Sequence, residues 1–278
     1  MPGWSSSERD PFRLYQLAVQ DPEAESTLIE GFFAERYGRL PQRLREDFCG
    51  TAALCAAWVR LRPDNLAWGV DLDPEGLAWG QVHNLGPLTA EQRRRIALIN
   101  GDVRSAVTPE VDIVAALNFS YWLLKTRTAL SEYLRHIRSL LAPEGLLILD
   151  VHGGPDAMRL HTERREIQDP LGEPFAYLWE RADFDPLSHT QTCYIHFQFT
   201  DGTSLERAFS YTWRLWTLPE LRELLVECGF GQVQVYGQGW DEAGNPDGCF
   251  APSERIGPAD LWIAYLVASP EKEHSEIP

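Results

Sequence analysis

Arg45-Glu-Asp-Phe-Cys-Gly-Thr-Ala52 is the stretch of sequence that decides the fold. A short strand pattern leads into it and a helical pattern follows it, so it forms the turn of a strand–turn–helix unit. The small side chains of Gly50, Thr51 and Ala52 would let a ligand approach the N–H groups at the helix start. One glycine falls short of the dinucleotide-binding pattern GxGxxG, and the need for a tight turn alone would also explain the presence of Gly50. The neighbouring segments must therefore decide whether this turn binds a ligand.

Strand and helix patterns alternate on both sides of the turn. The helical pattern at 128–141 is the clearest, because its apolar residues form one stripe and Pro143 and Gly145 follow it. Such alternation is typical of a mostly parallel sheet with helices on both faces. The predicted strands are 43–48, 66–71, 96–100, 111–118 and 146–151, and the other predicted helices are 51–61 and 74–85, after a helical lead-in at 12–42.

The pattern changes in the second half of the chain. From about 175 to 215 apolar residues such as Ile195 and Phe197 recur at every second position, and Asp201-Gly202 supplies a hairpin turn. We therefore predict a Rossmann-like α/β fold with a seven-stranded, mostly parallel sheet and an antiparallel β insertion. A helix with a capping box at 217–220 and strands at 232–236 and 261–267 complete the predicted elements.

The composition is that of an acidic globular chain of 278 residues. Its 41 acidic and 25 basic residues give a formal charge of −16, which would repel nucleic acid and anionic membranes. No apolar run approaches the roughly 18 residues that span a bilayer, and the N-terminal sequence lacks a signal-peptide core. The five cysteines are scattered and odd in number, which suggests a reducing compartment. We expect a cytoplasmic protein that binds neither nucleic acid nor membranes.

Two acidic residues at the ends of predicted strands make a ligand at the turn more plausible. Asp71 ends the second strand about twenty residues after the turn, where a carboxylate can accept two ribose hydroxyls. Asp102 follows the third strand and could accept a hydrogen bond from an exocyclic amine. Either acid alone is unremarkable, since loops are rich in Asp. The order of turn, Asp71 and Asp102 favours a nucleoside site.

These segments together resemble the class I S-adenosylmethionine-dependent methyltransferases. The resemblance is carried by LREDFCGTA, GVDLDPE, NGDV, VDIVAALNFSYWLL and LLAPEGLLILDVHGG, and it covers about 43–152 and resumes at 217–268. The most similar subset is bacterial and carries the segment REDFCGTA. Phe48 stands where the family has the first glycine of its motif, and Ala52 stands in place of the last. The resemblance implies S-adenosylmethionine as cofactor and S-adenosylhomocysteine as product.

The resemblance also assigns roles to residues of this chain. It implies that Asp71 holds the ribose, that Asp102 binds the adenine amine, and that Val103 meets the edge of the adenine ring through its backbone. Tyr15 and Gln20 lie in the helical lead-in, which typically forms a lid over the cofactor in this architecture. The expected cofactor-binding residues are Tyr15, Gln20, Glu46, Phe48, Cys49, Gly50, Thr51, Ala52, Asp71, Leu72, Asp102, Val103, Asn118 and Phe119.

Methyl transfer from a sulfonium is an in-line displacement, so positioning supplies much of the catalysis. A general base is needed only if the acceptor atom must lose a proton. We expect a small-molecule N or O acceptor, and no metal site. The candidate catalytic residues are Asn118, Tyr121 and His152, although His152 could instead cap a loop, and the candidate acceptor-binding residues are Ser120, Tyr121, Trp213 and Trp216.

The insertion is rich in aromatic residues, which attract cations. Trp213, Glu180 and His196 suggest an amine acceptor, but the aromatic residues could equally fill the interface between hairpin and sheet. Three other functions stay open: methylation of a protein, non-catalytic binding of S-adenosylmethionine or S-adenosylhomocysteine, and, more distantly, NAD-linked oxidation.

The chain divides into four expected segments. They are an N-terminal helical lid at 1–42, a methyltransferase core at 43–152 and 217–268, an antiparallel insertion on the acceptor side at 153–216, and a flexible tail at 269–278. The insertion could also pair with a second copy of the chain in a homodimer.

Overall fold

The computed structural model describes residues 9–257 and 259–270. These residues form two compact units, which we describe separately. Residues 9–21, 122–125 and 158–215 make up the antiparallel unit, named after its sheet. Residues 22–121, 126–157 and the described chain from 216 onward make up the parallel unit.

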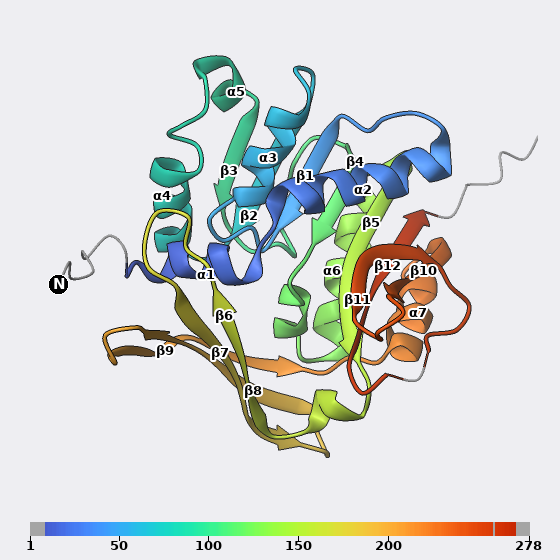
Figure 1. Cartoon of the computed structure of the whole chain (residues 1–278). Coiled ribbons are helices and arrows are strands. Elements are labelled where there is room, and N and C mark those ends of the chain that lie inside the picture. Colours follow the sequence, from blue (N-terminus) through green and yellow to red (C-terminus); the bar gives the residue numbers. More distant parts are fainter. Residues whose placement is uncertain (1–8, 258, 271–278) are drawn as a thin grey trace, which may run out of the picture. The chain divides into compact units, whose positions relative to one another are not determined.

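The parallel unit contains one eight-stranded sheet in the order β11-β10-β12-β5-β4-β1-β2-β3 (Figure 1). Strands β1 to β5 are parallel to one another, whereas the pairs β5–β12, β12–β10 and β10–β11 are antiparallel. The strands are β1 (Arg43–Asp47), β2 (Leu66–Asp71), β3 (Ile96–Asn100), β4 (Val111–Ala116), β5 (Leu141–Gly153), β10 (Phe230–Trp240), β11 (Pro246–Pro252) and β12 (Trp262–Pro270).

The mostly parallel α/β sheet is confirmed, but the predicted count of seven strands is wrong. The additional strand is β11, which pairs with the end of β10. Its sequence, PDGCFAP, has a proline at each end and a glycine inside, and nearly all its residues are exposed. Proline and glycine are depleted in strands, and an exposed edge strand shows no apolar alternation. The sequence therefore contains no strand signal at this position.

Helices cover both faces of the parallel sheet. Successive side chains of β1 point to opposite faces, and Glu46 accepts a hydrogen bond from α3 while Asp47 accepts one from Tyr133 of α6. The helices of this unit are α2 (Pro22–Tyr37), α3 (Ala53–Leu61), α4 (Pro74–His83), α5 (Ala90–Arg94), α6 (Arg127–Leu140) and α7 (Leu218–Glu227). The capping box that begins α7 is present, with Thr217 and Glu220 bonded to each other's backbone.

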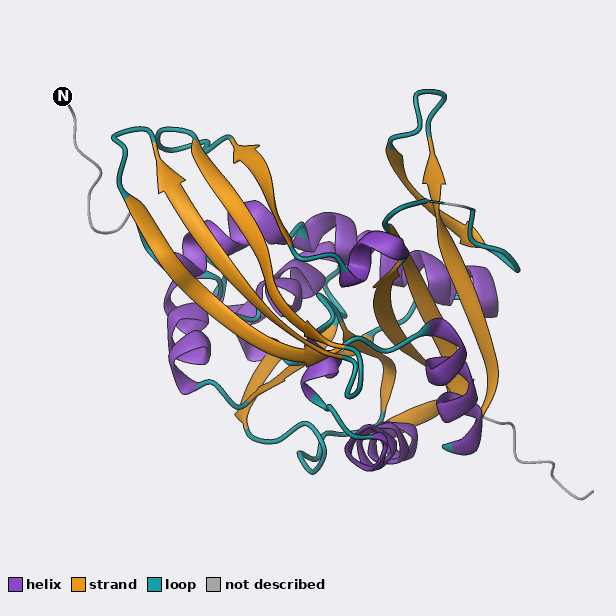
Figure 2. Cartoon of the chain, turned by 90° about the horizontal axis from the view of Figure 1, so that it is seen from below, coloured by secondary structure: helices purple, strands orange, loops and turns teal. Residues whose placement is uncertain are grey.

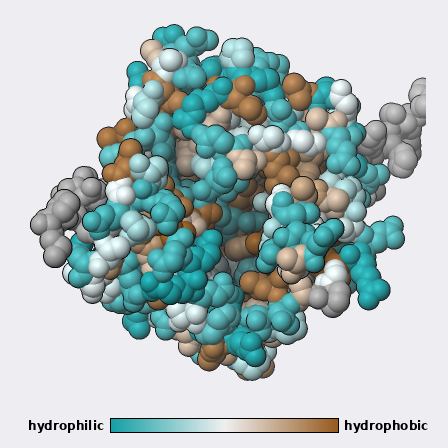
Figure 3. All heavy atoms as spheres, in the orientation of Figure 1, coloured by the Kyte–Doolittle hydropathy of each residue, from teal (hydrophilic) through white to brown (hydrophobic). Residues whose placement is uncertain are grey.

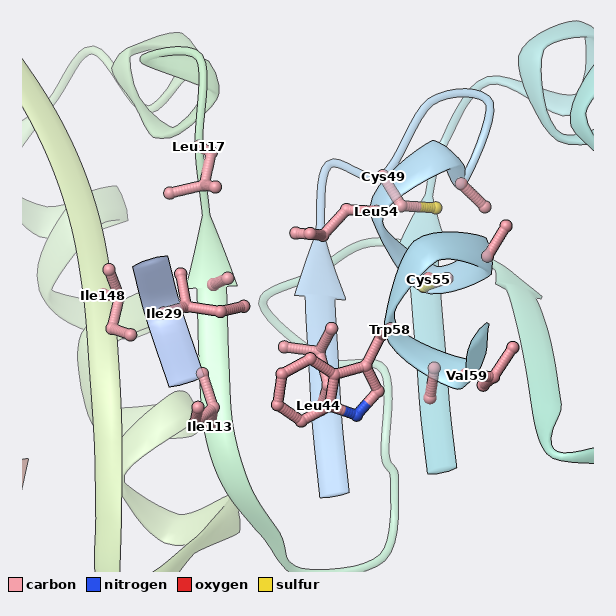
Figure 4. Packing of buried hydrophobic residues seen from close by; sticks show 14 of the residues in the cluster. Ile29, Leu44, Cys49, Leu54, Cys55, Trp58, Val59, Ile113, Leu117 and Ile148 are labelled. Carbon is pink, nitrogen blue, oxygen red and sulfur yellow. The ribbon is translucent and has the colours of Figure 1, made fainter. Parts of the chain in front are cut away.

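The core on the α2 and α3 side is tightly filled (Figure 4). Leu44 of β1, Ile113 of β4 and Ile148 of β5 are fully buried there, against Ile29 of α2 and Trp58 of α3. The Trp58 indole N–H donates to the carbonyl of residue 42 at 3.1 Å, so this large side chain is buried without a lost hydrogen bond. This core fixes the strands whose carboxyl ends carry the candidate site.

The antiparallel unit contains a four-stranded sheet in the order β6-β7-β8-β9. Strands are drawn in orange in Figure 2. The strands of this sheet are β6 (His161–Ile167), β7 (Phe175–Asp185), β8 (Thr190–Phe199) and β9 (Ser204–Arg214). The predicted hairpin is confirmed: Asp201 accepts from the Thr203 N–H at 3.0 Å, and Gly202 adopts a positive φ of 84°. Strand β6 was not predicted, because its sequence HTERREI is polar and mostly exposed.

The predicted lead-in at 1–42 is divided between the two units. Its first helix, α1 (Pro11–Val19), packs Leu14 and Ala18 against Phe175 and Phe197 in the antiparallel unit. Its second helix, α2, belongs to the parallel unit, and β1 begins at residue 43. Residues 1–8 of the predicted lid and 271–278 of the predicted tail lie outside the described residues, and residues 269–270 end β12.

The surface mixes hydrophilic and hydrophobic residues on the face drawn in Figure 3. Among the described residues, no helix is long and apolar enough to cross a membrane.

Candidate functional site

The turn between β1 and α3 has an unusual backbone. Phe48, Gly50 and Ala52 have positive φ angles of 57°, 51° and 56°, while the residues between them do not. Glycine adopts this conformation readily, whereas a non-glycine residue there costs about 1–3 kcal/mol. Hydrogen bonds hold the turn, with Cys49 N donating to Val70 O at 3.1 Å and Ala52 N to Cys49 O at 2.7 Å. Alternating backbone of this kind turns N–H groups toward one side, as in ligand-binding loops.

Asp71, at the end of β2, lies against this turn as predicted from the sequence. Its Oδ2 accepts the Gly50 N–H at 2.7 Å, and its Oδ1 accepts the Asp73 N–H at 2.8 Å. Burial raises the pKa of the Asp71 carboxyl, and these backbone hydrogen bonds oppose that rise. Each carboxylate oxygen has a second lone pair, so two ribose hydroxyls can still be accepted. The following residue, Leu72, is largely exposed.

Glu46 is the second acid at the turn. It is almost fully buried, and its Oε2 accepts the Cys55 N–H at 3.0 Å, one of the free donors in the first turn of α3. Burial raises the pKa of Glu46 to about 8, and the nearby acids Glu25 and Asp71 add to the rise. Burial, together with the charges of Glu46, Asp71 and Asp47, raises the pKa of the Cys49 thiol well above its usual value. The acids around this turn therefore favour the binding of a cation.

Helix α4 supports the turn from the side. A Cβ atom on Gly80 would lie 2.1 Å from the carbonyl oxygen of Thr51, which no side chain can tolerate. Asn84 donates from its side chain to the same oxygen at 2.8 Å. Gly76, one turn earlier, approaches the Gly50 backbone. The sequence prediction missed this contact, although two glycines four residues apart in a helical segment were a usable signal.

The loop after β3 carries Asp102 and Val103. Asp102 is partly exposed and pairs with Arg104, with an Nη2–Oδ2 distance of 2.6 Å. That hydrogen bond lowers the pKa of the Asp102 carboxyl. Val103 is buried, and its backbone carbonyl accepts from Arg45 at 3.0 Å. Arg104 and Arg45 were not predicted as part of the site.

The segment after β4 is organised by Asp150 of β5. Asn118 and Phe119 have positive φ angles of 56° and 57°, and their N–H groups donate to the two Asp150 oxygens at 2.7 and 2.9 Å. Burial raises the pKa of Asp150 to about 7. The Tyr121 hydroxyl donates to the Asp150 backbone carbonyl at 2.9 Å. The Phe119 ring meets the His152 ring edge-on, with centroids 4.7 Å apart.

The structure thus brings the candidate residues Asn118, Phe119, Tyr121 and His152 together around one buried acid. Ser120 is directed elsewhere, because its hydroxyl donates to the Leu117 carbonyl at 2.9 Å. Tyr121 is fully buried, so its hydroxyl supports the backbone of β5.

Glu25, in the first turn of α2, is a further acid that the sequence prediction missed. Its negative charge contributes to the raised pKa values of Glu46, Asp150 and Tyr265, which lie on β1, β5 and β12. Nothing in a helical pattern reveals which strand ends a glutamate faces, so only the structure identifies it.

The remaining candidates are described within their own units. In the antiparallel unit, the Tyr15 ring contacts that of Phe209 at 5.1 Å, and Gln20 caps α1 through its backbone. Trp213 is buried, with its ring 4.6 Å from Tyr211 and 5.5 Å from Trp179. Trp216 belongs to the parallel unit, where it is buried just before α7.

The antiparallel sheet places Tyr211 and Trp213 on one face and Glu180 and His196 on the other. The ladder pairs Cys193 with Tyr211 and Gln191 with Trp213, which places both aromatic residues on the face that packs against α1. Glu180 and His196 lie on the other face, where His196 bonds Glu180 at 2.9 Å and Glu206 at 2.5 Å. The carboxylates expected beside the aromatic residues are therefore not provided by Glu180.

A buried arginine occupies the aromatic face instead. Arg181 is 4% exposed, forms an ion pair with Glu163, and lies 3.0 Å from the His161 ring nitrogen Nδ1. Its Nε, like the amide nitrogen of the buried Gln191, has no hydrogen-bond partner within the described part of the chain. Within the same part, no three His, Cys, Asp or Glu side chains are placed to hold a metal ion.

Comparison with known proteins places this fold. No protein-family model and no curated protein matches the sequence. Among solved structures, the S-adenosylmethionine-bound amino pentose methyltransferase CalS10 from Micromonospora echinaspora has a TM-score of 0.67 and 16% identity, covering 97% of this chain and 98% of that chain.

Two other solved structures show the same likeness. The sugar N-methyltransferase KedS8 from Streptoalloteichus has a TM-score of 0.64 and 18% identity, over 98% of both chains. An S-adenosylmethionine-dependent methyltransferase from Clostridium acetobutylicum has a TM-score of 0.64 and 15% identity, over 93% of this chain and 96% of that chain. At these identities the likeness establishes the fold, which is that of S-adenosylmethionine-dependent methyltransferases.

Proposed function

We propose that this protein is an S-adenosylmethionine-dependent methyltransferase that acts on a small-molecule N or O acceptor. One observation carries the proposal most directly: the carboxylate of Asp71, from the end of β2, bonds to the Gly50 N–H of the turn. This contact joins a ribose-binding acid to a backbone turn at the carboxyl edge of a parallel sheet, where ligands of such sheets bind.

The charges of the site fit this cofactor. Burial raises the pKa of Glu46 to about 8 and that of Asp150 to about 7, and the negative charge of Glu25 adds to both rises. A pyrophosphate would be repelled by such a site, whereas a molecule with an ammonium group, a sulfonium and no phosphate would be attracted. The proposal therefore favours S-adenosylmethionine over a nicotinamide dinucleotide.

The residues would divide the binding as follows. Asp71 accepts the ribose hydroxyls, Asp102 accepts the adenine amine, and the Val103 N–H donates to the ring edge. The turn at 48–52 holds the methionine part, with Glu46 beneath it. Asn118 and Phe119, fixed by Asp150, border the reacting end.

S-adenosylmethionine supplies, when bound, a methyl group on a positively charged sulfur. The protein must orient an acceptor in line with that group and exclude water. We propose that His152 removes a proton where the acceptor is an amine, and that Phe119 holds the His152 ring in place. Asn118 and Tyr121 shape this end of the site.

The neighbouring structures suggest the kind of acceptor. CalS10 is an amino pentose methyltransferase and KedS8 a sugar N-methyltransferase. We propose that the acceptor here is likewise a small amine or hydroxyl compound, and that Trp213 and Trp216 contribute to its recognition. Aromatic faces pack against sugar rings and attract protonated amines.

The test is binding of S-adenosylhomocysteine, measured by calorimetry. Asp71→Ala should weaken binding more than about tenfold, because hydrogen bonds from the ribose hydroxyls to a charged carboxylate are lost. Glu223→Gln, an exposed acid on α7, is the matched control and should leave the affinity unchanged. Unchanged affinity in Asp71→Ala would reject the site. Tight binding without methyl transfer to any compound of a metabolite mixture would indicate a non-catalytic binder instead.

A further inference from the structure

Strand β1 carries a buried ion pair that the proposed site does not use. Arg45 and Asp47 point to the α6 face, opposite Glu46, and both side chains are fully buried. The Arg45 Nε donates to Asp47 Oδ1 at 2.7 Å, and the Tyr133 hydroxyl donates to Asp47 Oδ2 at 3.0 Å. Burying two charges is expensive, and a buried pair can often be replaced by apolar residues without loss of stability. Stability alone is therefore a weak reason for its presence.

The remaining donors of Arg45 reach the loop after β3. Its Nη1 donates to the Ala106 carbonyl at 2.7 Å, and its Nη2 donates to the Val103 carbonyl at 3.0 Å. His136 of α6 also lies 2.8 Å from the Ala106 carbonyl. Strand β2 separates β1 from β3 in the sheet, so this is a long-range tie. The planar fork of a guanidinium can satisfy three acceptors in fixed directions, which an ammonium cannot.

One peptide group connects Arg45 to Asp102. The Val103 carbonyl that Arg45 holds belongs to the same planar peptide as the Arg104 N–H. That N–H donates to Asp102 Oδ1 at 2.9 Å. At the other end of the loop, the Ala106 N–H donates to the Asp102 carbonyl at 2.8 Å. Rotation of the peptide between Val103 and Arg104, or of the peptide that carries the Ala106 N–H, would move the Asp102 carboxylate.

We infer that Arg45, held by Asp47, is a positioning residue for base recognition. It fixes the loop so that the Asp102 carboxylate and the Val103 N–H face a ring presenting an amine donor beside a nitrogen acceptor. This inference rests on the proposed function, since it places the adenine at this loop. A 6-oxo purine presents the reverse pattern, a carbonyl beside an N–H. A site built to pair with one pattern rejects the other strongly, because its polar groups are left unpaired.

The experiment compares two ligands, S-adenosylhomocysteine and its deaminated analogue S-inosylhomocysteine. The wild-type protein should prefer the first by about a hundredfold or more. The double variant Arg45→Met/Asp47→Leu removes the ion pair while keeping buried volume. It leaves the buried Tyr133 hydroxyl without its acceptor, so its Tm should fall while a cooperative folding transition remains. Its preference should fall below about tenfold, because the loop loses its tie.

Glu46→Gln is the matched control on the same strand. Its side chain points to the opposite face, toward the turn. Glu46→Gln should weaken the binding of both ligands equally, so the ratio of their affinities should stay unchanged. If Arg45 had only a structural role, the ratio would stay unchanged in the double variant as well.

A second variant guards against misfolding. Arg45→Lys keeps the charge opposite Asp47 but loses the fork, and it should also lower the preference at least about fivefold. An unaltered preference in either folded variant would overturn the inference. Failure of the wild-type protein to bind S-adenosylhomocysteine would instead reject the proposed function, so the two failures are distinguishable.

Discussion

The carboxyl edge of the parallel sheet and the aromatic face of the antiparallel sheet are constructed differently. At the sheet edge, short polar side chains hold backbone groups in fixed positions, as Asp71 does with Gly50 and Asp150 with Asn118. On the aromatic face, Trp179, Tyr211 and Trp213 contact one another through rings 4.6 to 6.0 Å apart. The first region is organised by directional hydrogen bonds, and the second by the packing of aromatic rings. The two regions should therefore respond differently to substitution.

The largest expected effect tests the aromatic side. Replacing Trp213 and Trp216 by Leu should abolish measurable methyl transfer, a loss of about a hundredfold or more, while S-adenosylhomocysteine affinity stays within about twofold. Calorimetry and a turnover assay separate the two properties. If both variants instead lose their folding transition, these residues serve packing and the comparison between the two regions fails.

The next effect tests how rigid the sheet edge is. Gly80→Ala places a methyl group 2.1 Å from the Thr51 oxygen and must displace the turn. It should cost about 1–3 kcal/mol of stability and weaken S-adenosylhomocysteine binding about tenfold. Gly31→Ala in α2 is the control, because nothing lies within 4 Å of its new methyl group. It should stabilise the protein by about 0.5–1 kcal/mol. Equal behaviour of the two variants would show that α4 does not position the turn.

A third effect follows from the raised pKa values of buried acids. Burial raises the pKa of Asp47 to about 6, of Asp150 to about 7 and of Glu46 to about 8. The unfolded chain has carboxyl pKa values near 4, so the folded state binds more protons between about pH 4 and about pH 8. The stability that these groups contribute is therefore present in acid and lost as the pH rises through their folded pKa values.

We expect the free energy of unfolding to fall by about 2 kcal/mol or more between about pH 5 and about pH 8, measured by urea titration. Acids with lowered pKa values, such as Asp102 and Asp169, change the free energy of unfolding only at a pH below this range. Binding of S-adenosylmethionine near pH 7 should release protons, because its cationic groups favour ionised Glu46 and Asp150. Stability that rises with pH across this range would contradict the electrostatics of the sheet edge.

The smallest effect concerns the acidic face of the antiparallel sheet. Glu206→Gln removes a charge from the His196 cluster, which lies on the face opposite Trp213. Turnover should change less than about twofold and stability by less than about 0.5 kcal/mol, since Glu206 is exposed. A larger fall in turnover would mean that the two faces of this sheet are not separate in function.

Much of the parallel sheet could be predicted because its strands are buried apolar runs. Strands β2 and β3 begin and end where the sequence pattern predicts, at 66–71 and 96–100. Asp71 could be placed at the turn because the ends of parallel strands share one edge. Strands β6 and β11 could not be predicted, since exposed edge strands carry no apolar alternation.

The candidate site was predictable only in part. Arg45 and Asp47 look like surface residues in a sequence, because a buried ion pair has the same residue types as an exposed one. The distance from Glu25 to the strand ends depends on tertiary packing alone. The opposite orientation of Trp179 and Glu180 was available from the period of two, since neighbours in a strand point to opposite faces.

The antiparallel unit is assembled from three separate stretches of chain, and α1 completes it from far away in the sequence. Arg13 of α1 pairs with Asp169 at 2.6 Å, and Leu14 lies among the phenylalanines of β7 and β8. A chimera that exchanged only residues 158–215 with a homologous enzyme would therefore place α1 on a foreign surface. The compact unit comprises residues 9–21, 122–125 and 158–215 together, so any attempt to transplant this sheet should move all three.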